Sequence, residues 1–244
     1  MNAPLILPGA PGGVLLICDH ASNAVPVDVV LGIDPLLLDK HIAIDIGAAP
    51  LTRGLAARLN APAILATVSR LVIDLHREPD HPALIPLASD GYTISRNEAA
   101  DRADRIRRFH SPYHDALAAL IVAERPILLA SIHSFTPELE SGGAGQRPWQ
   151  AGILSNQDRR AADIAIRLLT EAGIVTGDNE PYSGQLLNAT LNRHGEANDI
   201  PSVAIEIRND LIRDDAGVAR WTDILAPILA EMSKILASRR PSAT

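Results

Sequence analysis

The run VLLIC at Val14–Cys18, followed at once by the polar residues DHASN at 19–23, decides the fold class. Five consecutive apolar residues are typical of a strand that is buried on both faces of a parallel sheet. Two later runs, ILLASI at Ile127–Ile132 and VAIEI at Val203–Ile207, have the same character. The three runs therefore predict strands of one central sheet.

The segments between these runs alternate helical and strand patterns. Helices are predicted at residues 34–59 with a break at Gly47 and Pro50, 97–124 with a break before Pro112, 158–172 and 215–236. Shorter apolar runs predict strands at residues 63–67, 71–75, 152–154 and 174–176, and residues 80–95 predict a long loop. This alternation predicts an α/β fold with three α/β/α layers, a largely parallel mixed central sheet and one domain over residues 1–244.

Composition and charge exclude several classes of function. The chain has 244 residues and a formal net charge of −7, which argues against nucleic acid and anionic membranes as partners. The N-terminal residues lack the basic start and long apolar stretch of a signal peptide, and no apolar segment reaches the ~20 residues of a membrane span. Cys18 is the only cysteine, so no intrachain disulfide can form. We expect a cytoplasmic protein.

Chemically reactive residues stand where the predicted strands end. They are Asp19, His20, Asp74, His76, Arg77, His133, Glu206 and Arg208. In open α/β sheets, ligands bind beyond the carboxyl ends of the strands. The recurrence of histidine, carboxylate and arginine at these ends therefore predicts a functional site along one edge of the sheet.

Two of these residues are candidate metal ligands. His20 and His133 follow the two most apolar strands and would project into one crevice if those strands are neighbours. Neutral imidazole suits zinc, and a third, carboxylate ligand would leave one position open for water. Asp45 is the candidate carboxylate, because it lies four positions after His41 and would share a helix face with it. Alternatively, Asp45 caps the helix that begins near Pro50, and either histidine is structural.

Glu206 lies inside VAIEI, between two isoleucines. A charged carboxylate in a buried strand is costly unless it is paired or close to a metal. One interpretation is a proton shuttle beside the metal. The other is a structural ion pair with Arg208, which shares a strand face with Glu206 because the side-chain period of a strand is two.

Three arginines complete the candidate site. Arg70 and Arg77 flank the run LVIDL, and Arg208 ends the last predicted strand. A guanidinium group binds a carboxylate in a bidentate fork, so this set favours a small anionic substrate, although any one of the three could be structural. The G-x-S-x-G, Walker A and H-E-x-x-H motifs of other enzyme classes are absent.

With these residues identified, the chain resembles the N-formylglutamate amidohydrolases, a family that is similar to the zinc carboxypeptidases and aspartoacylases and has a phosphorylase/hydrolase-like α/β/α fold. The resemblance extends from near the start of the chain to about residue 212. The matching segments are DHASNAVP at 19–26, HIAIDIGA at 41–48, SRLVIDLHR at 69–77, SIHSFTP at 131–137, NEPYSG at 179–184 and PSVAIEIRNDLI at 201–212.

The resemblance implies a Zn²⁺ ion, or another divalent transition metal, that activates water to attack an N-acyl amino acid such as N-formyl-L-glutamate. The ligand places fall on His20 and His133. Asn23 stands where the aspartoacylase pattern has a glutamate, so Asp45 is our substitute for the third ligand. Glu206 would act as the general base, and Arg70 would stabilise the oxyanion. Arg77 and Arg208 would bind the substrate carboxylate. His76 and Tyr182 would make further contacts with the substrate.

One further departure concerns selectivity, because the related DLNR motif appears here as DLHR, with His76 in place of asparagine. A carboxypeptidase or another N-acyl amino-acid deacylase is a second interpretation on the same fold. A metal-free protein that binds small anionic metabolites is a third. The first two require that His20, His133 and Glu206 converge on one point.

Overall fold

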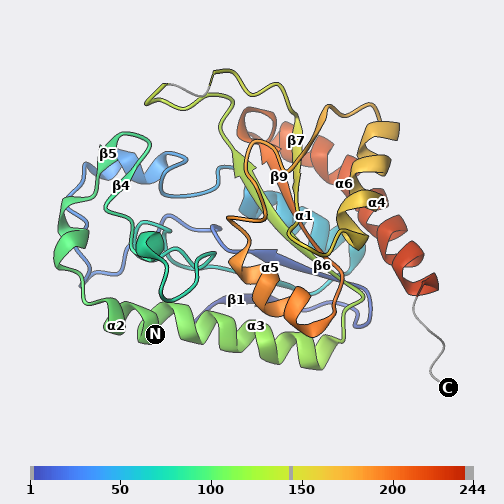
Figure 1. The fold of residues 1–244 in the computed structure, drawn as a ribbon, viewed down its shortest axis with the longest axis horizontal. Coiled ribbons are helices and arrows are strands. Elements are labelled where there is room, and N and C mark those ends of the chain that lie inside the picture. The colour runs from blue at the N-terminus through green and yellow to red at the C-terminus, as the bar shows by residue number, and fades with distance from the viewer. Residues whose placement is uncertain (1–2, 143–144, 240–244) are drawn as a thin grey trace.

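A seven-stranded mixed sheet forms the centre of the computed structural model, which describes residues 3–142 and 145–239 (Figure 1). The strand order is β1-β3-β2-β6-β9-β7-β8. These strands are β1 (Leu5–Leu7), β2 (Val14–Cys18), β3 (Ala63–Leu65), β6 (Leu128–Phe135), β7 (Ala151–Leu154), β8 (Thr176–Asp178) and β9 (Ser202–Arg208). Strands β3, β2, β6 and β9 run parallel, whereas β1 and β7 are antiparallel to their inner neighbours. The four parallel strands therefore end at the same edge of the sheet.

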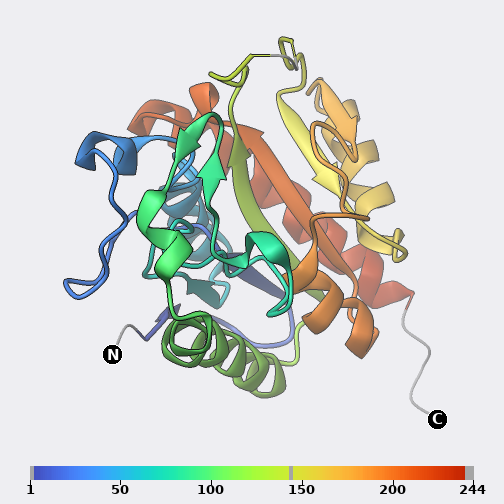
Figure 2. The same ribbon diagram turned by 60° about the vertical axis from the view of Figure 1, so that its left-hand side comes forward.

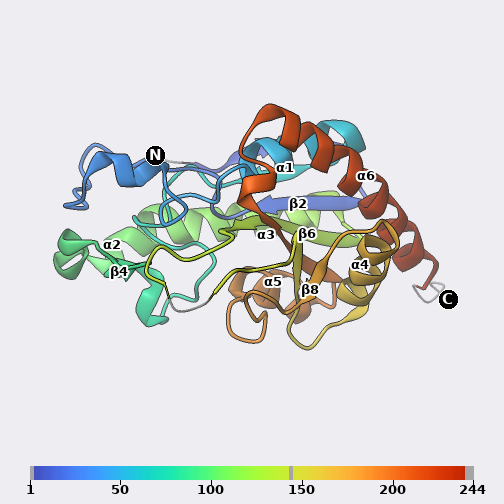
Figure 3. The same ribbon diagram turned by 90° about the horizontal axis from the view of Figure 1, so that it is seen from above.

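Helices cover both faces of this sheet. The helices α1 (Ala48–Leu59), α4 (Arg160–Glu171) and α6 (Asp215–Ser238) pack on one face, and α3 (Ser111–Glu124) and α5 (Ala189–His194) pack on the other. Figure 2 shows the sheet between α3 and α6, and Figure 3 shows α1 and α6 on one side with α5 on the opposite side. The predicted three-layer α/β/α fold with a largely parallel mixed sheet is confirmed, and its phosphorylase/hydrolase-like character stays a prediction.

The alternation of side chains along β6 and β9 separates the core from the polar residues. Leu128, Ala130 and Ile132 of β6 pack against α1, α4 and α6, as do the odd-numbered residues 203–207 of β9. Because successive side chains of a strand point to opposite faces, Ser131 and His133 lie on the other face. Glu206 lies on that face too, since it pairs in register with His133.

The helix predicted at residues 34–46 is wrong, and of the two predicted breaks the one at Gly47 is correct, whereas α1 continues through Pro50. A short 3₁₀ helix spans Pro35–Asp39 and is followed by turns, and α1 begins only after Gly47. Gly47 has a φ of 81°, and a Cβ atom there would lie 2.1 Å from the Ile212 carbonyl oxygen. Only glycine fits this position, so the chain turns there and carries Asp45 to the edge of the sheet.

Residues 69–77 form an irregular buried segment, and the strand predicted at 71–75 is wrong. The carbonyl groups of this 69–77 segment accept hydrogen bonds from side chains at positions 97–114. The donors are Asn97 to Leu71 O (2.8 Å), Arg105 to Val72 O (2.6 Å), His114 to Leu75 O (3.0 Å) and His110 to Arg77 O (2.9 Å). Buried carbonyl groups need such partners, so these side chains replace a neighbouring strand.

The helix predicted from Asn97 begins later, at α2 (Arg102–Arg105), where Asp101 caps it by accepting a hydrogen bond from the Asp104 N–H. A π-helical turn at Ile106–His110 then leads directly into α3. The π turn precedes Pro112, which has no N–H to donate. The predicted interruption is thus a change of helical type and not a break.

The predicted loop at 80–95 contains the hairpin of β4 (Ala88–Ser89) and β5 (Tyr92–Thr93), which lies beyond the sheet edge in Figure 1. Short 3₁₀ helices span Pro82–Leu84, Ser95–Ala99, Glu196–Asn198 and Asn209–Leu211. No helix in the described ranges is long and apolar enough to cross a membrane. The single domain over 1–244 stays a prediction, and residues 1–2, 143–144 and 240–244 lie outside the described part.

Candidate active site

A cavity of about 410 Å³ opens at the carboxyl ends of β2, β6 and β9. From β2 the chain continues outward to β3 on one side, and β6 lies on the other side of β2. A parallel sheet leaves a crevice where the strand order reverses in this way, and ligands bind there. The cavity therefore lies where this topology predicts a ligand site.

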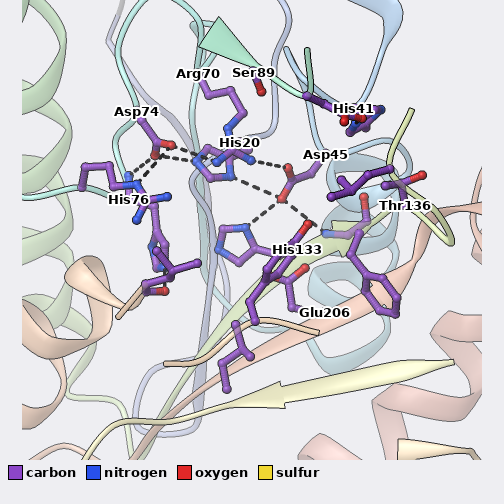
Figure 4. A pocket seen from close by; sticks show the side chains of 18 of the residues that line it. His20, His41, Asp45, Arg70, Asp74, His76, Ser89, His133, Thr136 and Glu206 are labelled. Carbon is purple, nitrogen blue, oxygen red and sulfur yellow. Dashed lines mark hydrogen bonds and ion pairs between the residues drawn. The ribbon is translucent and has the colours of Figure 1, made fainter. Parts of the chain in front are cut away.

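Three side chains converge at the floor of the cavity (Figure 4). Asp45 Oδ2 lies 2.8 Å from His133 Nδ1 and 3.3 Å from His20 Nδ1. The two imidazole rings have centroids 5.0 Å apart, and all three residues are at most 3% exposed. Asp45 does not cap α1, whose N-terminus has no side-chain cap. Two imidazoles and one carboxylate, with ligand atoms within 4.8 Å of one another, form a group that could hold a metal ion.

Each of the two histidines is also held from behind by a carboxylate. His20 Nε2 lies 2.8 Å from Asp74 Oδ1, and His133 Nε2 lies 3.5 Å from Asp19 Oδ2 and 3.0 Å from Ser131 Oγ. Histidines that ligate metals usually donate their second N–H to a carboxylate or carbonyl group, which fixes the tautomer and the ring orientation. Both Nδ1 atoms thus face Asp45 while both Nε2 atoms are anchored, and this arrangement fits a divalent metal ion.

The electrostatics of this centre favour a bound cation. Burial opposes ionisation of Asp19, but hydrogen bonds from His133 and His76 hold the pKa of its carboxyl well below the usual range. Burial likewise opposes the charged form of His133, yet hydrogen bonds to Asp19 and Asp45 raise the pKa of His133 well above its usual value. Ionised carboxylates therefore surround the imidazoles, and a metal ion can replace the protons that the imidazoles hold.

Glu206 faces this centre from the adjacent strand. Its Oε2 atom is buried and has no hydrogen-bond partner among the described residues. Burial raises the pKa of its carboxyl to about 7. The alternative ion pair with Arg208 does not form, because Arg208 Nε binds Asp210 Oδ1 at 2.8 Å and Arg208 Nη1 reaches the Arg147 carbonyl oxygen at 3.3 Å. Glu206 thus carries an unsatisfied buried oxygen, which points to a ligand or a proton as its partner.

The predicted arginines differ in position. Arg70 is fixed by two carboxylates, with Nη1 3.2 Å from Asp45 Oδ1 and Nη2 2.9 Å from Asp74 Oδ2. Arg77 lines the cavity with a single long contact, 3.7 Å from Asp74. Arg208 does not line the cavity, because Asp210 and the loop before β7 hold its guanidinium group elsewhere. Of the three, Arg77 is the cation with most capacity left for an anionic ligand.

The two remaining predicted substrate contacts also line the cavity. His76 has both ring nitrogens engaged, since Nδ1 lies 3.0 Å from Asp19 Oδ2 and Nε2 lies 2.9 Å from the Leu187 carbonyl oxygen. Tyr182 presents its ring to the cavity and accepts a hydrogen bond from Arg147 through its phenol oxygen. The structure therefore gathers the predicted residues at one cavity, with Arg208 as the exception.

A model of the N-formylglutamate amidohydrolase family matches residues 12–213. The chain belongs to this family. The matched region includes all the residues of the centre described above, so the family resemblance seen in the sequence is confirmed. No curated protein matches the chain.

Solved structures support the fold of this family member. A gene product of Agrobacterium tumefaciens is 31% identical over 97% of each chain, with a TM-score of 0.90. An N-formylglutamate amidohydrolase from Ralstonia eutropha is 21% identical over 98% of this chain and 99% of that chain, with a TM-score of 0.67. A bacteriophage poly-gamma-glutamate hydrolase is 11% identical over 98% of this chain and 91% of that chain, with a TM-score of 0.50. The last two likenesses concern the fold alone.

Sequence reasoning gave no role to several residues of this amidohydrolase-family site. Asp19 and Asp74 stand at predicted strand ends, and their position beside histidines was the available signal. At the cavity mouth, the Glu140 carboxylate contacts Lys40 and Tyr92 at 2.6 Å each, and Asp90 contacts His41 at 2.8 Å and the Ser141 N–H at 2.9 Å. These contacts connect the β4–β5 hairpin to the loop after β6, and no local sequence pattern predicts them.

Two neutral histidines beneath the 69–77 segment make the protein sensitive to acid. His114 donates through Nε2 to Leu75 O, so its Nδ1 accepts from His194 Nε2 at 2.9 Å. Burial lowers the pKa of His114 to about 3 and that of His194 to about 4. Since an unfolded histidine has a pKa of about 6.5, the unfolded chain binds more protons below that pH. The contribution of these two histidines to stability is therefore fully present above about pH 6.5 and falls as the pH drops towards the folded values.

We expect His194→Gln to reduce this loss. The cost for each buried neutral histidine is about 1.4 kcal/mol per pH unit below about pH 6.5. The difference in unfolding free energy between about pH 7.5 and pH 5, measured by urea titration, should therefore shrink by about 2 kcal/mol in the variant. An unchanged difference would show that His194 is protonated in the folded protein.

Proposed function

We propose that this protein is a metal-dependent amidohydrolase that removes the acyl group from N-acyl amino acids, with N-formyl amino acids such as N-formyl-L-glutamate as its substrates, in the cytoplasm. The observation that carries the proposal is the convergence of His20, Asp45 and His133 beside the unsatisfied oxygen of Glu206. Membership of the N-formylglutamate amidohydrolase family supports the reaction type. The net charge of −7 makes nucleic acid an unfavourable partner.

In this proposal His20, Asp45 and His133 hold zinc, and the bound ion supplies Lewis acidity and lowers the pKa of a water towards about 7. The protein contributes the orientation of the two imidazoles. Asp74 and Asp19 fix the rings from behind, and the 69–77 segment sets the position of Asp74. The pre-set geometry keeps both Nδ1 atoms directed at one point.

Glu206 moves the proton in this reaction. The attacking water forms a bond to the acyl carbon and gives its proton to the Glu206 carboxylate. Glu206 then delivers a proton to the amine nitrogen as the C–N bond breaks, so the products are the free acid and the amino acid. Its buried, partner-free Oε2 supports this role, because no competing hydrogen bond among the described residues holds the carboxylate.

The cationic side of the cavity recognises the substrate. Arg77 binds the substrate carboxylate, since it lines the cavity with little of its charge compensated. Arg70 stabilises charge on the acyl oxygen, and its pairing with Asp45 and Asp74 keeps the guanidinium group in place without ligand. Tyr182 and His76 line the same cavity.

A metal assay and a substrate panel test the proposal together. After mild purification, elemental analysis should find about one zinc per chain. The zinc-loaded protein should hydrolyse N-formyl-L-glutamate faster than N-acetyl-L-glutamate, N-acetyl-L-aspartate and C-terminal peptides. Faster release of C-terminal residues from peptides would instead identify a carboxypeptidase. A chain that binds these anions without metal or turnover would be a binding protein.

The outer carboxylate Asp19 provides a sharper test of the metal centre. We expect Asp19→Asn to weaken zinc binding by about 10–100-fold, because it removes the anion behind His133. Chelator competition measures the dissociation constant. Asp90→Asn is the matched control, since Asp90 contacts a cavity-lining histidine, His41, away from the metal centre. Equal zinc affinity in Asp19→Asn and the control would refute the orienting role of Asp19.

A further inference from the structure

Arg147 is a buried arginine that lacks an ion pair. It lies in the connection between β6 and β7 and is 7% exposed. No carboxylate in the described part of the chain is within ion-pair distance of its guanidinium group, in contrast to Arg70 and Arg159. Burial of a cation without an ion pair is costly, so the contacts that this guanidinium group makes are the reason to look for at this position.

The side-chain hydrogen bonds of Arg147 go to two residues of the cavity wall. Its Nη1 atom donates to the Thr136 carbonyl oxygen at 3.1 Å and to the Tyr182 phenol oxygen at 3.1 Å. The guanidinium carbon lies 5.0 Å from the centroid of the Tyr182 ring, at cation–π distance. Thr136 and Tyr182 both line the cavity, whereas Arg147 itself does not. Arg147 therefore acts on the cavity through Tyr182.

The hydrogen bond from Arg147 leaves the proton of Tyr182 available. A phenol group both accepts and donates, and here its oxygen accepts from Arg147 while no acceptor among residues 3–142 and 145–239 takes its proton. Tyr182 lines the same cavity as Glu206 and Arg70, the groups assigned to the reaction. The phenol O–H is thus free to donate to a ligand in this cavity.

We propose that Arg147 is a positioning residue that holds Tyr182 so that its phenol O–H donates to the carbonyl oxygen of the scissile acyl group, a role that rests on the proposed function. The adjacent cation strengthens the donor, because a charged N–H on the phenol oxygen makes its own proton more acidic. Tyr182 and Arg70 then stabilise the same oxygen as negative charge develops on it. A donor used mainly in the transition state affects kcat more than KM.

Arg208 offers a matched control for this role. It binds the same connection, with Nη1 3.3 Å from the Arg147 carbonyl oxygen and 3.5 Å from those of Pro148 and Trp149. It is paired with Asp210 and does not line the cavity. Loss of Arg208 tests the stability of the connection between β6 and β7. Loss of Arg147 also removes the hydrogen bond to the Tyr182 phenol.

The experiment is a double-mutant cycle with zinc-loaded protein and N-formyl-L-glutamate. Arg147→Met and Tyr182→Phe should each lower kcat by about 10–100-fold with KM changed by less than about threefold. The kcat of the double variant should be no lower than that of the less active single variant, because both changes remove the same interaction. Arg147→Lys should recover part of kcat, and Arg208→Met should stay within about twofold of wild type.

Two results would overturn the inference: an unchanged kcat in Arg147→Met, or multiplicative losses in the double variant. If Arg147→Met does not fold, Arg147→Lys and Tyr182→Phe carry the same cycle. An inactive wild type refutes the proposed function instead. In that case the phenol pKa of Tyr182 is measured by ultraviolet titration, with Tyr182→Phe as the reference. Loss of the adjacent cation in Arg147→Met should raise this pKa, and an unchanged value overturns the positioning role.

Discussion

Glu206→Gln is expected to lower kcat for N-formyl-L-glutamate by about 10²–10⁴-fold, the usual contribution of a general acid–base. Glutamine keeps the shape of the side chain but cannot accept the proton from the attacking water. Zinc content and KM should remain close to wild type, because Glu206 makes no hydrogen bond to His20, Asp45 or His133. Single-turnover kinetics measure the rate of the chemical step, and elemental analysis of the same samples measures the zinc content.

A nearby exposed glutamate serves as the control for this change. Glu138 lies on the loop after β6, with its side chain exposed and outside the cavity lining. Glu138→Gln alters the net charge by the same amount and should leave kcat within about twofold of wild type. Full activity in Glu206→Gln would show that another group moves the proton.

The second large effect is expected for Asp45→Asn, which should abolish stable zinc binding. Asp45 is the only carboxylate shared by His20 Nδ1 and His133 Nδ1 in the described part of the chain, so the amide removes the charge on which both converge. The loss of affinity should exceed the factor of about 10–100 that is typical of an outer partner. Chelator competition and dialysis followed by elemental analysis measure it, and activity should fall with zinc content.

Zinc retention by Asp45→Asn would contradict the assignment of the third ligand. The alternative would then be the second buried group that could hold a metal ion, which consists of Asp19, His76 and His133. His41→Gln is a suitable control, since His41 lines the same cavity but contacts Asp90. Normal zinc affinity in His41→Gln would separate a specific loss of the ligand from a general disturbance of the cavity.

The sequence predicted the sheet and the location of the site because apolar runs are a local signal. β2, β6 and β9 are each buried on both faces, so their runs are unbroken, and the polar residues that follow mark the edge of the sheet. His133 and Glu206 pair with each other inside their strands, before the strands end at the pair of Phe135 and Arg208. Alternation along the strand, and not only its end, places them at the cavity.

The failures have a common physical cause. Leu71–Leu75 is as apolar as a strand, yet its carbonyl groups are satisfied by Asn97, Arg105 and His114, which lie 26, 33 and 39 residues further along the chain. A local pattern does not contain such partners. The same holds for Arg147, because its proposed role depends on its hydrogen bond to Tyr182, 35 residues away. Fold class follows from periodicity, whereas the support of a site follows from long-range polar contacts.

The side-chain support of the 69–77 segment has a consequence for how this enzyme family can diversify. Arg70, Asp74 and Arg77 depend for their position on a few donors at positions 97–114, while His133 and Glu206 belong to the rigid sheet. Substitutions along α2 and α3 can therefore shift the anion-binding half of the cavity without moving the proton-transfer half. Under the proposed function, the choice of acyl amino acid could therefore change through residues that do not line the cavity.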